Sequence, residues 1–95
     1  MDNIDKLDYE IRKRIHLLKD NKGYYVDNFI NITDSKIIHY FETKEYDFIL
    51  KLQKGDSYIN LKIISIKTSR TEVIWNSRDI DETFKMMQQF ISKDI

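Results

Sequence analysis

Two histidines, His16 and His39, are the side chains of this 95-residue sequence best suited to acid–base chemistry near neutral pH. His39 falls at an inward position of a predicted strand, where a neutral imidazole bonded to a backbone carbonyl or a tyrosine is more common than a general base. Asp79, Asp81 and Glu82 could bind a hard cation, but their position at a predicted helix start favours capping. The chain has no cysteine, nucleophile elbow, HExxH pattern or phosphate-binding glycine loop. We therefore expect no catalytic residues, no metal, no cofactor and no enzymatic activity.

The densest basic run of the sequence lies on a predicted N-terminal helix and comprises Arg12, Lys13, Arg14 and His16. It is either a second candidate binding patch or a solvated helix face whose charge is offset by Asp8 and Glu10. The chain as a whole has a formal net charge of zero, which argues against strong long-range attraction to nucleic acid.

The length and composition predict a single domain over residues 1–95. No apolar run approaches the ~20 residues of a membrane span, and the acidic first ten residues do not resemble a signal peptide. We expect a cytoplasmic protein with no membrane partner. Alanine and proline are absent and glycine occurs twice, which indicates an AT-rich gene of the kind common in bacteria, phages and mobile elements.

The clearest structural signal is a β-hairpin over 46–68. Gly55 and Asp56 form a two-residue loop signal, because glycine supplies the positive φ that the hairpin twist requires. Counting back from this loop, Leu52 faces Ile59 on one strand face, and Leu50 faces Leu61 two residues further on.

The same kind of counting predicts an α+β fold in which an N-terminal helix, an antiparallel meander of four to five strands and a C-terminal helix follow one another. A stop at Gly23 ends the first helix, Asp79 caps the second, and Asp27-Asn28 could interrupt the first strand. The predicted helices are about 3–21 and 79–93, and the predicted strands are about 24–32, 36–43, 46–54, 57–67 and 71–76.

The end of the sheet is harder to predict. A loop at Ser69-Arg70 would place Ile64 opposite Trp75 and Ile66 opposite Val73. The core side of the 57–67 strand would then change from its odd-numbered to its even-numbered residues, with a bulge at Ile63-Ile64.

The sheet face opposite the predicted core carries an apolar and aromatic row that is too apolar to be left open on a monomer. It could be covered by one of the helices, by a second copy of the chain or by a partner protein. The candidate partner-binding residues are Phe29, Ile38, Tyr40, Ile49, Tyr58 and Lys62. An alternative is single-stranded nucleic acid, since open sheets with aromatic and cationic side chains bind it, although Lys51, Lys62 and Lys67 are a modest cationic supply.

We therefore expect a small non-enzymatic protein-binding module that occupies the surface of a host or cognate protein. Its most concrete form is a phage or mobile-element inhibitor of a host defence protein, in the manner of anti-CRISPR proteins. A homodimer and a single-stranded nucleic-acid-binding protein are the alternatives.

Overall fold

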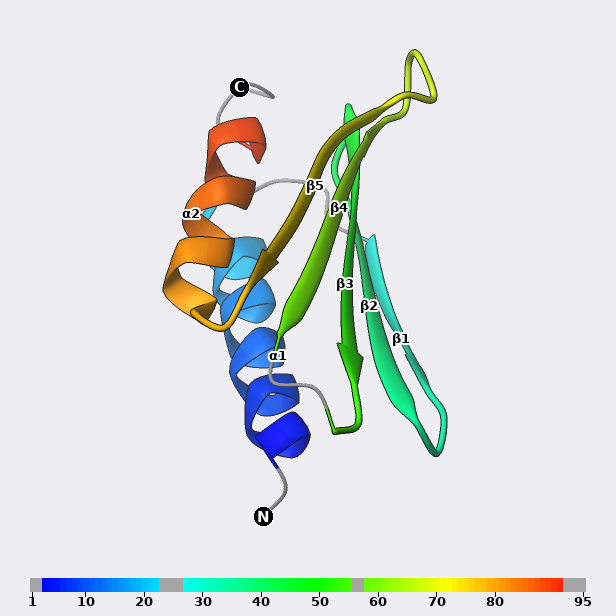
Figure 1. Cartoon of the computed structure of the whole chain (residues 1–95). Coiled ribbons are helices and arrows are strands. Elements are labelled where there is room, and N and C mark those ends of the chain that lie inside the picture. The colour runs from blue at the N-terminus through cyan, green and yellow to red at the C-terminus, as the bar shows by residue number, and fades with distance from the viewer. Residues whose placement is uncertain (1–2, 23–26, 56–57, 92–95) are drawn as a thin grey trace.

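The computed structural model describes residues 3–22, 27–55 and 58–91 and has the predicted α+β architecture. Two helices lie on one side of an antiparallel sheet whose strands are hydrogen-bonded in the order β1-β2-β3-β4-β5 (Figure 1). The elements are α1 (Asn3–Lys22), β1 (Asp27–Ile32), β2 (Lys36–Glu42), β3 (Tyr46–Gln53), β4 (Ile59–Ser65), β5 (Thr71–Ser77) and α2 (Ile80–Ile91).

The predicted register of the first four strands is confirmed. Leu52 pairs with Ile59 and Leu50 with Leu61, and the pairing of β2 with β3 places His39 opposite Leu50. Gly55 has a φ of 86°, the left-handed conformation that the hairpin turn requires, and Asp56 lies outside the described residues. β1 pairs with β2 without a register shift through Asp27-Asn28, while Gly23 and residues 24–26 lie outside the described part of the chain.

The predicted pairing of the last two strands is wrong. Ile63 lies opposite Val73, and the connecting loop runs from Ile66 to Arg70, with Ser69 at a φ of 58°. The register shifts between Ile63 and Ile64, as expected, but β5 advances two residues there while β4 advances one. The extra residue is therefore on β5, and the core side of β4 stays on its odd-numbered residues.

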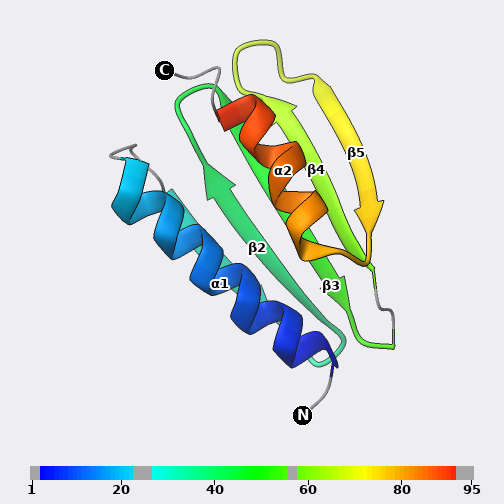
Figure 2. The same cartoon turned by 90° about the vertical axis from the view of Figure 1, so that its left-hand side faces the viewer.

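Both helices pack against the same face of the sheet (Figure 2). α1 lies over the β2 half and α2 over the β4 half, so the two helices share one layer. The core between the layers is aliphatic and aromatic, with Phe41 and Phe48 in edge contact at 5.4 Å between ring centroids. From the helices it contains Ile4, Ile11, Ile15, Phe84, Met87 and Ile91, and from the sheet Ile37, Phe41, Phe48, Leu50, Leu52, Ile59, Leu61 and Ile63.

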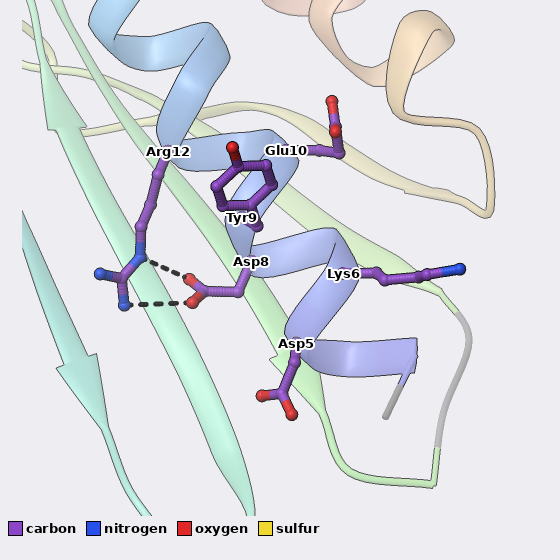
Figure 3. Close-up of a pocket in the computed structure, with 6 residues that line it drawn as sticks. All are labelled: Asp5, Lys6, Asp8, Tyr9, Glu10 and Arg12. Atoms are coloured by element: carbon purple, nitrogen blue, oxygen red, sulfur yellow. Dashed lines mark hydrogen bonds and ion pairs between the residues drawn. The ribbon is translucent and has the colours of Figure 1, made fainter. Parts of the chain in front are cut away.

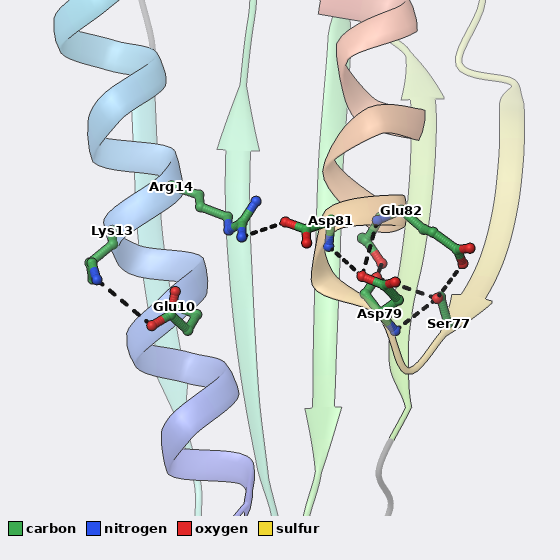
Figure 4. A network of polar contacts seen from close by, with 8 residues as sticks. Glu10, Lys13, Arg14, Ser77, Asp79, Asp81 and Glu82 are labelled. Atoms are coloured by element: carbon green, nitrogen blue, oxygen red, sulfur yellow. Dashed lines mark hydrogen bonds and ion pairs between the residues drawn. The ribbon is translucent and has the colours of Figure 1, made fainter.

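The start of α2 is held by a compact polar network (Figure 4). Asp79 caps the helix as predicted, since its Oδ1 accepts hydrogen bonds from the backbone N–H groups of Asp81 at 2.8 Å and Glu82 at 3.4 Å. The Ser77 hydroxyl accepts a bond from the Asp79 N–H at 2.9 Å and lies 3.2 Å from the Glu82 carboxylate. Ser77 thus links Glu82 to the cap, in place of the direct capping-box contact that the spacing suggests.

We expect Leu50→Ala to lower the free energy of unfolding by about 2–5 kcal/mol, because it opens a cavity in a fully buried site. Ile74→Ala is the matched control. This side chain is 73% exposed, so its truncation should change stability by less than about 0.5 kcal/mol. Urea titration of both variants measures the difference, and equal losses would contradict the assignment of the two faces.

Candidate functional site: an open sheet face

The sheet face opposite the helices is uncovered by any helix or strand in the residues that the structure describes (Figure 1). Because side chains alternate along a strand, the residues between the core positions point to this side of the sheet. We call this surface the open face. Its members in β2 to β5 are Lys36, Ile38, Tyr40, Glu42, Asp47, Ile49, Lys51, Gln53, Asn60, Lys62, Ile64, Ile74 and Asn76.

The open face has an apolar row at its centre. The ladders place Tyr40 beside Ile49, Ile49 beside Lys62, and Lys62 beside Ile74. Ile74 is 73% exposed, whereas Tyr40 and Ile49 are half-buried by their neighbours on the same face. Phe29 continues the row as the backbone partner of Tyr40, but its side chain lies outside what the structure describes.

A shallow hollow lies on the open face where β3, β4 and β5 run side by side. Ile49 and Ile74 supply its apolar surface, and Lys51 and Lys62 supply positive charge. Asn60 and Asn76 pair across β4 and β5 and also line the hollow. The arrangement offers an apolar floor with amide and ammonium donors, which suits a protein surface with apolar side chains and carboxylates.

The structure spreads the predicted partner-binding residues along the open face. Ile38 lies one row from Tyr40, next to Lys51. Tyr58 lies just before β4 and is covered by the Arg78 guanidinium, 4.7 Å from the ring centroid. Tyr58 is therefore at one end of the face and already engaged in a cation–π contact.

The second candidate patch, on α1, is largely paired with carboxylates. Arg12 forms an ion pair with Asp8 at 3.1 Å, and Figure 3 shows the two side chains facing each other beside a hollow. Lys13 pairs with Glu10, and Arg14 pairs with Asp81 of α2 (Figure 4); the fourth patch residue, His16, is exposed on the same helix. These pairs make the patch a mixed-charge surface that ties α1 to α2.

Beneath this helix, His39 is buried, with 1% of its surface exposed. Its Nε2 lies 2.7 Å from Asp8 Oδ1, and the same oxygen accepts a bond from Arg12 Nε at 3.1 Å. The expected carbonyl or tyrosine partner of His39 is thus wrong, because α1 brings a carboxylate over β2. Nδ1 is buried and has no hydrogen-bond partner among the described residues. A neutral imidazole that donates from Nε2 to Asp8 satisfies this geometry.

Burial lowers the pKa of His39 below its ordinary value of 6.5. The hydrogen bond and the charge of Asp8 act in the opposite direction, and the charge of Arg12 adds to the lowering. Desolvation of the imidazolium is the largest of these effects, so the neutral form predominates in the folded protein at neutral pH.

Several kinds of site have no counterpart in the described residues. No group of three or more histidine, cysteine, aspartate or glutamate side chains there could hold a metal ion. Within the same residues, no helix is long and apolar enough to cross a membrane. The hollow beside α1 in Figure 3 combines Asp5, Asp8 and Glu10 with Lys6 and Arg12, so its charges largely offset one another.

Two residues with a role in these sites, Ile74 on the open face and Asp8 against His39, are not evident from the sequence. Ile74 was missed because the predicted pairing of β5 was wrong, and the alternation of Val73 and Trp75 with Ile74 was the available signal. The sequence indicates only that Asp8 offsets basic charge on its helix, whereas its contact with His39 spans 31 positions of sequence. No local pattern in the sequence indicates such a contact.

We expect the free energy of unfolding to fall as pH decreases from about 7.5 to about 5.5. Unfolded chains bind a proton at His39 near pH 6.5, whereas the folded protein, with its lowered pKa, binds it only at lower pH. Urea titrations across this pH range should show the same fall in the free energy of unfolding for wild type and for His16→Gln. The fall should be smaller for His39→Gln. A His39→Gln profile parallel to that of wild type would contradict the role of His39.

Comparisons with protein-family models, with curated proteins and with solved structures find no match to this chain.

Proposed function

We propose that this chain is a non-enzymatic protein-binding module whose open face receives the surface of a partner protein. The observation that carries the proposal is the row in which Tyr40 and Ile49 lie side by side, and Ile74 follows beyond Lys62, on a face that no described helix covers. A sheet usually buries both faces or makes one of them polar. An apolar row on the uncovered face is typical of an interaction surface.

The physical properties of the row fit a protein interface. Tyrosine and isoleucine gain free energy when they leave water, at about 25 cal/mol per Å² of apolar surface. Tyrosine also provides a hydroxyl for a polar contact, which is one reason why it is enriched in binding hot spots. Lys51 and Lys62 border the row and can pair with carboxylates at the rim of a partner surface.

Single-stranded nucleic acid is the second candidate occupant, because Tyr40 and the two lysines lie on one sheet face. Against it, Glu42 and Asp47 are paired neighbours on the same face and repel phosphates. The protein partner is therefore the better supported proposal. The phage or mobile-element inhibitor of a host defence protein, acting in the cytoplasm, is its most concrete form and rests on the composition of the chain.

Capture from lysate tests the proposal. Beads carrying wild-type protein should retain partner proteins at least about tenfold more than beads carrying Tyr40→Asp with Ile49→Asp, because the variant places two charges in the centre of the interface. The matched control is Tyr9→Asp with Leu17→Asp, which makes the same kind of change at exposed positions of α1.

Circular dichroism shows whether both double variants keep the fold. Retention of the same proteins by the open-face variant as by wild type would overturn the proposal. Binding of a labelled single-stranded oligonucleotide that is lost in the open-face variant and weakened by salt would instead assign the face to nucleic acid.

A further inference from the structure

We infer that the occupant of the open face is a second copy of this chain, packed face to face about a two-fold axis with its strands antiparallel to those of the first. This inference rests on the proposed function of the face and names a second copy as its partner, in place of the host protein that is the most concrete form of that proposal. It is carried by the order of charges along β2, which makes the face complementary to itself.

The outward side chains of β2 run from a cation through two apolar groups to an anion. In order they are Lys36, Ile38, Tyr40 and Glu42, and both charged ends are exposed. Neither Lys36 nor Glu42 has an ion pair within the described part of the chain. The ladder places Asp47 of β3 next to Glu42, so the acidic end holds two carboxylates.

One two-fold arrangement pairs these opposite charges. A two-fold axis in the plane of the interface, perpendicular to the strands and level with His39, brings β2 of one copy over β2 of the other. Lys36 of each copy then faces Glu42 of the other, and Ile38 faces Tyr40. On β3, Ile49 lies over the aliphatic stem of Lys51.

The other simple arrangement has its axis parallel to the strands and is disfavoured by charge. It would place β3 over β3 in the same direction, so that Asp47 would face Asp47 and Lys51 would face Lys51. Like charges that meet in an interface are unfavourable. The antiparallel arrangement avoids both contacts and forms the Lys36–Glu42 pair twice.

The size of the face is sufficient for a dimer of modest affinity. Five strands of six to eight residues, about 4.8 Å apart and rising about 3.3 Å per residue, cover about 500 Å². Two such faces bury about 1,000 Å², near the lower limit of specific interfaces. A net charge of zero also means that two copies do not repel each other at long range.

Sedimentation velocity over a dilution series tests the inference with charge-reversal variants. We expect wild-type protein to dimerise with a Kd of about micromolar magnitude. Lys36→Glu alone and Glu42→Lys alone should each weaken the dimer at least about fivefold, because each places like charges opposite one another twice. A mixture of the two single variants should recover the wild-type affinity as a heterodimer, since every facing pair is then opposite in charge.

The control is Lys6→Glu, an exposed cation on α1, which should leave dimerisation unchanged. Single variants that dimerise like wild type, or a mixture no tighter than either variant, would overturn the antiparallel arrangement. A wild-type chain that stays monomeric would overturn the second-copy inference. Capture of another protein through the open face would still support the proposed function in that case, so the two failures are distinguishable.

Discussion

The alternation of side chains along β2 and β3 is the constraint on which the rest of the structure depends. Ile37 and Phe41 of β2 and Phe48, Leu50 and Leu52 of β3 all point to one side and are buried there. Because a shift of one residue would exchange the two faces, this pairing fixes which side becomes the core. The positions of the helices, the burial of His39 and the composition of the open face all follow from that choice.

Both helices that the structure describes lie on one side of the sheet, and neither covers the other side. Side by side, they bury the centre of this face, whereas Ile32 of β1, on the same face as Ile37, stays 60% exposed. The opposite face keeps side chains that are apolar at its centre and charged at its ends. That combination leaves apolar surface in contact with water in the monomer and makes this surface available for binding.

Much of the fold could be predicted from the sequence because the informative contacts are local. Gly55 determines the central turn, and strand alternation extends the register from there to β1. The pairing of β5 could not be predicted, since the loop before it is longer than two residues and Glu72 is an extra residue in the ladder. The helix side and the Asp8–His39 contact depend on tertiary packing, which no short pattern encodes. The row through Tyr40 and Ile49 was predictable from the register, whereas its extension to Ile74 depends on the pairing of β5.

The ion pair between Arg14 and Asp81 has a consequence for the order of folding. Each strand of the meander pairs with its neighbour in sequence, so the sheet can close one hairpin at a time at a small cost in loop entropy. The ion pair, in contrast, joins the helices that precede and follow the meander in sequence and lie side by side on one face of the sheet. It forms only when the meander has already brought α1 and α2 together, so this contact belongs to the stage at which both helices are docked on the sheet.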